Sequence, residues 1–229
     1  STKRTTQAES LGGAGAGDIP GAQDGLPFNT VPHERDGKPK PKAQRNFTDP
    51  ESRIMFRDGT FVQAYNAQIA VDEGHQIIVA AALSNQGTDA EYFDPMLERI
   101  AENCGAVPTH VTADAAYFSV ENVAAAEAMG AEPFMSVGSH HRNGRPDDLP
   151  AITNRQTPER TAMRDLLESP RGHAVYARRK ATVEPVFGQI RACPGFRQMS
   201  FRGLFKNRCE WLLVCATHNL LKLWPFAAR

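Results

Sequence analysis

An acidic residue inside a basic, partly apolar stretch could bind a metal ion in a site that also handles phosphates. Glu184 has such neighbours in the sequence: Arg178, Arg179, Lys180 and Arg191. The apolar residues of this stretch recur at helical spacing, which predicts a helix. An exposed salt bridge would give the same pattern, since such ion pairs are common and weak. The spacing alone leaves both interpretations open.

A second acid follows a short apolar segment directly. Residues 109–113 read as a buried strand, and Asp114 comes next. Ligand sites of α/β sheets collect beyond the carboxyl ends of strands, although a helix N-cap or a turn would also explain this aspartate. Together, Asp114 and Glu184 could bind a divalent metal through oxygen ligands, as phosphoryl-transfer sites require.

The other acids and histidines fit structural roles. Asp72 lies in a turn between two expected strands, and Asp58 precedes a glycine in a second turn signal. Asp89 is the expected N-cap of the helix that follows it. His218 lies in an apolar helical segment, where a hydrogen-bonded core histidine is the simpler interpretation. The pair at 140–141 lies in a polar loop, which indicates solvated side chains.

Periodicity and turn residues predict a mixed α/β domain that begins with an antiparallel hairpin. The expected strands are residues 61–71, 75–83, 109–113 and 132–137, and the expected helices are residues 90–103, 120–129, 157–168, 171–191 and 207–223. Residues 1–45 are rich in Gly, Ser, Pro, Lys and Gln and are expected to be a disordered polar linker. Residues 46–229 form the expected domain, with a flexible crossing at 138–156.

Charge divides the chain into two unlike halves. Residues 151–229 hold 14 basic and 5 acidic residues, whereas residues 1–150 hold 12 basic and 21 acidic residues. A basic C-terminal surface could bind nucleic acid, or it could pack on the acidic half. The four cysteines show neither zinc-site nor disulfide spacing, and no signal peptide or membrane-spanning run is present. We therefore expect a cytoplasmic protein without a membrane partner.

Six segments carry a family resemblance when taken in their order along the chain. They are Thr48-Asp-Pro-Glu-Ser-Arg-Ile-Met55, Gln63-Ala-Tyr-Asn-Ala-Gln-Ile-Ala-Val-Asp72, Thr112-Ala-Asp-Ala-Ala-Tyr-Phe-Ser119, Thr182-Val-Glu-Pro-Val-Phe-Gly-Gln-Ile-Arg191, Phe201-Arg-Gly-Leu204 and Thr217-His-Asn-Leu-Leu-Lys222. This series resembles the catalytic domain of bacterial insertion-sequence DDE transposases over about residues 46–224. The resemblance implies a ribonuclease-H-like fold, a mixed sheet flanked by helices.

The resemblance also implies a chemistry and a set of site residues. In this family three carboxylates hold two Mg²⁺ or Mn²⁺ ions, and the enzyme uses these ions to cleave DNA strands and to transfer them. Asp114 is the implied second acid and Glu184 the implied third acid, while Asp72 is a further candidate metal ligand. DNA is the expected partner, as element ends and as target, and a homodimer is a candidate assembly. The residues expected to contact DNA are Tyr176, Arg178, Arg179, Lys180 and Arg191.

One departure from the family pattern sets the expected activity. The first acid of these transposases lies on the first strand, in an Asp-Gly-Thr-like segment. Asp58-Gly59-Thr60 has these letters, but its neighbours place it in the hairpin region that follows. We therefore expect the first strand and its acid to be missing, which makes the chain an incomplete transposase. The alternatives are a non-catalytic DNA-binding remnant and a metal-dependent nuclease of the same fold.

Overall fold

The computed structural model describes residues 34–36, 38, 44–57, 59–138, 157–192 and 195–227. Most of the expected linker, most of the crossing at 138–156, Asp58 and the histidine pair at 140–141 lie outside these residues. The elements in chain order are β1 (Arg53–Arg57), β2 (Thr60–Ala64), β3 (Asn66–Val71), β4 (Ile78–Ser84), the 3-10 turn η2 (Ala90–Tyr92), α2 (Phe93–Cys104), β5 (His110–Ala113), α3 (Val120–Met129), β6 (Glu132–Met135), α4 (Pro158–Glu168), α5 (Pro170–Ala192) and α6 (Leu204–Ala227).

The strands form three separate pairs. β1 and β2 pair antiparallel, β3 and β4 pair antiparallel, and β5 and β6 pair parallel. The single strand predicted at 61–71 is wrong, because the chain breaks at Tyr65 and pairs with β1 before this residue and with β4 after it. The predicted turn at Asp72 does form the β3–β4 hairpin, with the Asp72 carboxylate accepting a hydrogen bond from the His75 amide at 2.8 Å.

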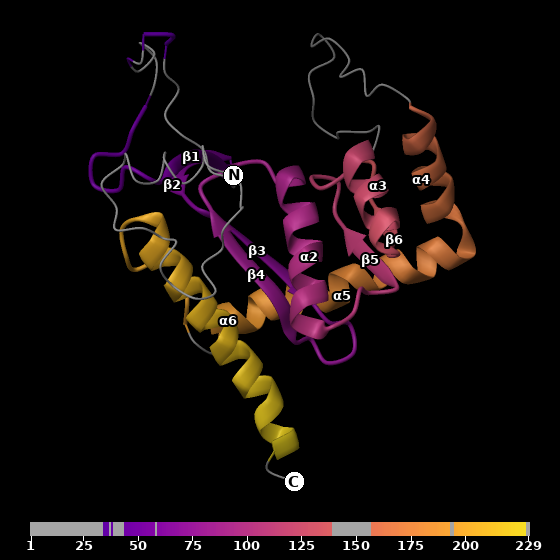
Figure 1. Ribbon diagram of the computed structural model, residues 1–229. Helices are drawn as coiled ribbons and strands as arrows, with labels where there is room; N and C mark the ends of the chain where they lie inside the picture. Colours follow the sequence, from indigo (N-terminus) through magenta and orange to yellow (C-terminus); the bar gives the residue numbers. More distant parts are fainter. Residues whose placement is uncertain are drawn as a thin grey trace.

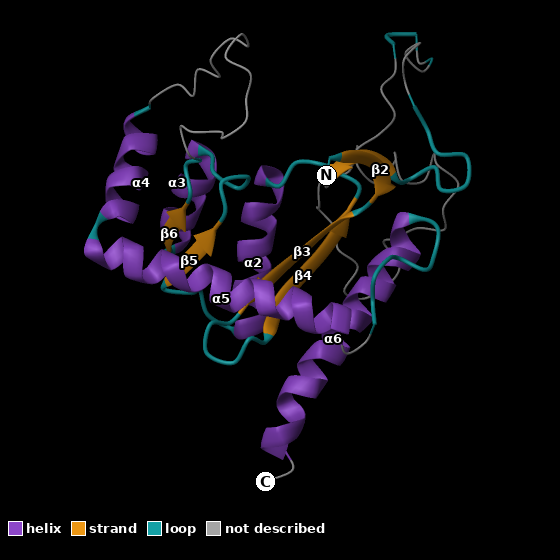
Figure 2. Ribbon diagram, turned by 180° about the vertical axis from the view of Figure 1, so that it is seen from behind, coloured by secondary structure: helices purple, strands orange, loops and turns teal. Residues whose placement is uncertain are grey.

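Helices cover both faces of the β3–β4 and β5–β6 pairs, as an α/β layer architecture requires, whereas β2 is largely exposed. α2 packs against β4 on one face, and α5 runs across β3, β5 and β6 on the other. Figure 1 shows α2 in front of the strands, and Figure 2, seen from behind, shows α5 crossing them. The predicted mixed α/β class is confirmed. Among the described helices, none is both long and apolar enough to cross a membrane.

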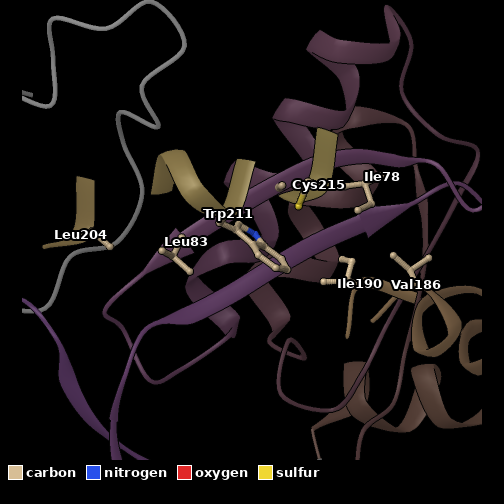
Figure 3. Packing of buried hydrophobic residues seen from close by; sticks show 8 residues of the cluster. Ile78, Leu83, Val186, Ile190, Leu204, Trp211 and Cys215 are labelled. Carbon is tan, nitrogen blue, oxygen red and sulfur yellow. The ribbon is translucent and has the colours of Figure 1, made fainter. Parts of the chain in front are cut away.

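The largest buried cluster joins β4, α5 and α6. Trp211 and Cys215 of α6 pack with Leu83 of β4 and with Val186 of α5 (Figure 3). Trp211 and Cys215 are buried in this cluster, whereas Leu220 on the same helix is 68% exposed. The apolar residues of α6 surround the helix on all sides, and its C-terminal half extends away from the body (Figure 1).

Three of the motifs that carry the family resemblance meet at the start of α6. The carboxylate of Asp49 accepts a hydrogen bond from the Gly203 amide at 3.1 Å, and that of Glu51 accepts one from the Leu204 amide at 2.6 Å. Tyr65 donates its hydroxyl to the same Asp49 carboxylate at 2.7 Å. Acidic groups at a helix N-terminus satisfy its free amides and complement its dipole. These motifs therefore anchor α6 to the strands.

Candidate active site

A cavity of about 670 Å³ lies between the two central strand pairs. β3 and β5 border the cavity on its two sides. α2 closes it on the face seen in Figure 1, and α5 closes it on the face seen in Figure 2. The wall residues are mostly apolar, and carboxylates gather near its mouths. Concave sites of this kind, with a few polar groups at defined places, are where binding and catalysis concentrate.

Asp114 and Asp89 lie at one end of this cavity. Both residues line it. Burial raises the pKa of the Tyr117 hydroxyl, and the negative charges of Asp89 and Asp114 raise this pKa further. Tyr117 also lines the cavity. Two carboxylates from distant parts of the sequence therefore act on one side chain, which places them in the same neighbourhood.

Asp89 occupies the predicted N-cap position, here of η2, but its side chain makes no capping hydrogen bond. Its carboxylate instead accepts hydrogen bonds from the side-chain amides of Asn66 at 2.6 Å and Gln68 at 2.8 Å. Sequence reasoning missed this acid as a site residue. The available signal was the pair of amides two residues apart, which must share one face of a strand.

Asp114 sits where the sequence predicted, directly after β5. One of its carboxylate oxygens accepts a hydrogen bond from the Ala116 amide at 2.9 Å, which is the turn role that the sequence left open. No partner of the second oxygen is found among the described residues. The geometry therefore leaves one oxygen available for a ligand at the cavity.

Asp72 lies at the opposite end of the cavity from Asp114. Arg171 of α5 contacts His110 at the start of β5, and Arg178, two helical turns further on the same face, pairs with Glu73 just after β3. The end of β3 is therefore level with the start of β5, so these two strands run antiparallel across the cavity. Asp72 follows β3, and its carboxylate lies 3.6 Å from the His75 ring.

Glu184 projects from the middle of α5 and is exposed. It is not among the residues that line the cavity, although its neighbours Thr182 and Val183 are. No ion pair to Glu184 is found in the described part of the chain, so the predicted alternative of a surface salt bridge is not formed there. Arg178, one helical turn and a half before it, pairs with Glu73 instead at 2.8 Å.

The backbone beside Glu184 is held by an unusual contact. Pro185 has no amide hydrogen, so the carbonyl of Ala181 loses its helical partner. The side-chain amide of Gln76 donates to this carbonyl at 3.1 Å, while its oxygen accepts from Lys222 at 2.8 Å. Gln76 has a left-handed backbone, with φ at 58°. The β3–β4 turn thereby fixes α5 and α6 at the level of Glu184.

The basic residues expected to contact DNA differ in what they touch. The Arg179 guanidinium lies 5.5 Å from the centre of the Tyr176 ring, and its buried Nε has no hydrogen-bond partner among the described residues. Lys180 and Arg191 are exposed. Arg178 is 62% exposed and paired with Glu73, a contact worth little in water. Lys180, Arg191 and Arg178 can therefore turn toward an anionic ligand in solvent, whereas Arg179 is half-buried and lines the cavity.

A match to a known protein family identifies the family of this chain. The transposase DDE domain matches residues 29–220, which is most of the chain. The protein belongs to the DDE transposase family. No curated protein and no solved structure matches the chain. Membership implies DNA binding and DNA transposition catalysis, and DDE transposases generally use divalent metal ions.

The described residues do not by themselves fit a complete metal site of that kind. No three His, Cys, Asp or Glu side chains within the described ranges lie close enough together to bind a metal ion. Asp114 and Asp89 share one end of the cavity, Asp72 is at the other end, and Glu184 is on the exposed side of α5. A carboxylate from outside these residues, a movement of α5, or both would be needed to complete the site.

Proposed function

We propose that this chain is part of a bacterial insertion-sequence transposase catalytic domain that binds DNA but does not cleave it alone. The observation that carries the proposal is the match of the transposase DDE domain to residues 29–220. The separation of the carboxylates around the cavity supports the second half of the proposal. A ribonuclease-H-like sheet would join β3 and β5 through a further strand, and a homodimer remains part of the proposal.

Asp114 and Glu184 are the carboxylates that we propose for the reaction. Asp114 follows a strand at the lined cavity and keeps one oxygen without a partner among the described residues. Glu184 is exposed on a helix whose neighbouring side chains are basic, and no ion pair engages it within the described ranges. Asp72 is the weaker candidate, because it lies at the opposite end of the cavity from Asp114.

We propose that DNA is bound along the exposed side of α5. Lys180 and Arg191 offer positive charges there. Arg179 is half-buried against the Tyr176 ring and lines the cavity instead. Such contacts to phosphates release counterions, so the logarithm of the binding constant falls with the logarithm of salt concentration by about 0.9 per contact. Binding should therefore be sequence-tolerant and sensitive to salt.

Fluorescence anisotropy with a labelled duplex tests this proposal. Replacing Lys180 and Arg191 together by alanine should weaken binding to every duplex sequence. It should also reduce the slope of the logarithm of the binding constant against the logarithm of salt concentration by about 1.8, the equivalent of two phosphate contacts. Arg45→Ala, which also removes a positive charge but lies far from α5 in the sequence, is the matched control and should leave the slope unchanged. Equal slopes for the double variant and the unmodified chain would contradict the placement of DNA on α5.

The alternative of a metal-dependent nuclease makes the opposite prediction for activity. Such an enzyme would nick plasmid DNA with Mg²⁺ or Mn²⁺ without any added segment. The absence of a third carboxylate beside Asp114 and Asp89 within the described ranges favours the non-catalytic reading of this chain.

A further inference from the structure

The β1–β2 hairpin stands apart from the layered body of the protein. β1 and β2 pair only with each other among the described strands, and every residue of β2 before Ala64 is exposed. Figures 1 and 2 both show the hairpin beside the start of α6. A lone two-stranded hairpin is only marginally stable in water, so contacts at its base must hold this one in place.

Hydrogen bonds at the base of the hairpin attach it to the body. Asn85, just after β4, donates its side-chain amide to the Glu51 carbonyl at 2.9 Å. The Ser52 hydroxyl donates to the side-chain oxygen of Gln63 at 3.2 Å, which joins the entry to β1 with β2. The carboxylates of Asp49 and Glu51 hold the first amides of α6. The base is therefore anchored, while the turn end of the hairpin extends into solvent.

Two phenylalanine rings are exposed near the turn of the hairpin. Phe56 of β1 and Phe61 of β2 oppose each other across the strands, with ring centres 5.1 Å apart and ring planes at 60°. Phe56 is 67% exposed and Phe61 is 76% exposed. An edge-to-face contact of this kind uses the edge of one ring and one face of the other. The remaining ring faces are therefore open to a flat ligand.

All the phenylalanines that are exposed in the described part of the chain belong to this region. Besides the hairpin pair they are Phe47 and Phe201. Each of these lies two residues from one end of the hydrogen bond between the Asp49 carboxylate and the Gly203 amide, so both flank the base of the hairpin. The other large exposed apolar side chains are aliphatic, apart from Trp224 near the end of α6. A surface rich in exposed aromatic rings favours stacking on bases, since every base has a π-face.

Positive charges accompany these rings. Arg202 and Lys206 lie at the start of α6, and both side chains are exposed. No ion pair of either one is found among the described residues. The acids at the base of the hairpin, Asp49 and Glu51, instead accept hydrogen bonds from backbone amides at the start of α6. The unpaired charge beside the rings is therefore positive, which complements a phosphate backbone.

We propose that the β1–β2 hairpin binds unpaired nucleotides of a DNA strand, with bases stacked on Phe56 and Phe61 and phosphates contacted by Arg202 and Lys206. Phe56 lies three residues after the first residue of β1, which is about 10 Å along the strand, so a few nucleotides span the distance from the turn to the base. Stacking accepts any base, and binding should depend little on sequence. The inference rests on the proposed DNA binding and adds a second form of DNA, unpaired, at a surface other than α5.

The test measures the fluorescence anisotropy of a labelled oligothymidine of about 12 nucleotides as the full chain is added. Replacing Phe56 and Phe61 together by leucine keeps the side chains apolar but removes the rings, so it should weaken binding at least about tenfold. Replacing both by tyrosine restores the rings and should recover the binding. Arg202→Ala should reduce the salt slope by about 0.7, the value of one phosphate contact on a single strand. Equal affinity of the leucine and tyrosine variants would overturn the proposal, and so would absence of saturable binding to the unmodified chain.

Photocrosslinking tests the same site on the unmodified chain. Oligothymidine that carries 5-iododeoxyuridine should crosslink under ultraviolet light to a peptide containing Phe56 or Phe61, as mapped by mass spectrometry. Crosslinks confined to α5 or to the apolar end of α6 would overturn the proposal even if the leucine variant fails to fold. A duplex offers no unpaired base, so its affinity should be the same for the leucine variant and the unmodified chain. Loss of duplex binding with crosslinks to the hairpin retained would contradict the placement of DNA on α5 and support this site.

Discussion

Two glycines of α5 should respond in opposite ways to the same substitution. A Cβ atom added at Gly172 would lie 1.9 Å from the Leu166 carbonyl oxygen and 2.7 Å from its carbon, whereas a Cβ at Gly188 meets no atom within 4 Å. The Leu166 carbonyl also accepts a hydrogen bond from the Ser169 hydroxyl at 2.6 Å, and this hydroxyl accepts one from the Gly172 amide. Gly172 is thus a point of close approach between α4 and α5.

The magnitudes follow from these contacts. Alanine gains about 1 kcal/mol of helix propensity over glycine at either position. At Gly172 the backbone must move apart, which costs about 3 kcal/mol by overpacking, and the Ser169 hydrogen bonds are strained at about 1 kcal/mol more. We expect Gly172→Ala to lower the free energy of unfolding by about 3 kcal/mol and Gly188→Ala to raise it by about 1 kcal/mol.

Urea unfolding followed by circular dichroism measures both variants under the same conditions. The midpoint for Gly172→Ala should fall well below that of the unmodified chain, while the midpoint for Gly188→Ala should rise slightly, with equal slopes for the two variants. If Gly172→Ala unfolded at the same urea concentration as Gly188→Ala, the close approach of α4 to α5 would be refuted.

Gln76→Ala should lower the free energy of unfolding by about 1 kcal/mol, because a helix carbonyl loses its partner, and adding Pro185→Ala should recover most of this loss in a double-mutant cycle. Trp211→Ala should cost about 3–5 kcal/mol by opening a cavity, whereas Leu213→Ala, on the exposed side of α6, should change the same free energy by less than about 0.5 kcal/mol in urea titrations. Burial raises the pKa of the Cys215 thiol to about 12. The stabilisation from holding this thiol neutral is therefore complete below the unfolded pKa of about 8.5 and is lost as the pH rises toward 12. At pH 8, mass spectrometry should find no alkylation of Cys215 by iodoacetamide until the chain is unfolded, and rapid native labelling would show that it is not buried.

The sequence predicted those elements whose signals are local. The turn at Asp72 gave the β3–β4 hairpin, and regular apolar spacing gave α2, α3, α4 and α5 within a few residues. The break at Tyr65 was not predictable in this way, since it depends on a hydrogen bond to Asp49, sixteen residues away. Likewise, the buried side of α6 cannot be read from a helix that is apolar on all sides.

The candidate site was predicted in part for the same reason. Asp114 was placed correctly after a strand because a short apolar run and the acid that follows it are adjacent in sequence. The approach of Asp89 to Asp114 depends on how β3 and β5 face each other, which no local pattern encodes. The exposed position of Glu184 depends on the rotation of α5 about its axis, which is set by contacts such as that of Gln76 with the Ala181 carbonyl.

The central claim is that this transposase chain binds DNA but lacks the means to cleave it. The most direct measurement is nicking of supercoiled plasmid by the purified chain with Mg²⁺ or Mn²⁺, beside a salt titration of binding to the same DNA. We expect no metal-dependent nicking, together with binding that weakens steeply as salt increases. Metal-dependent nicking that is lost in both Asp114→Asn and Glu184→Gln would contradict the claim, because it would show that the chain already holds a complete catalytic site.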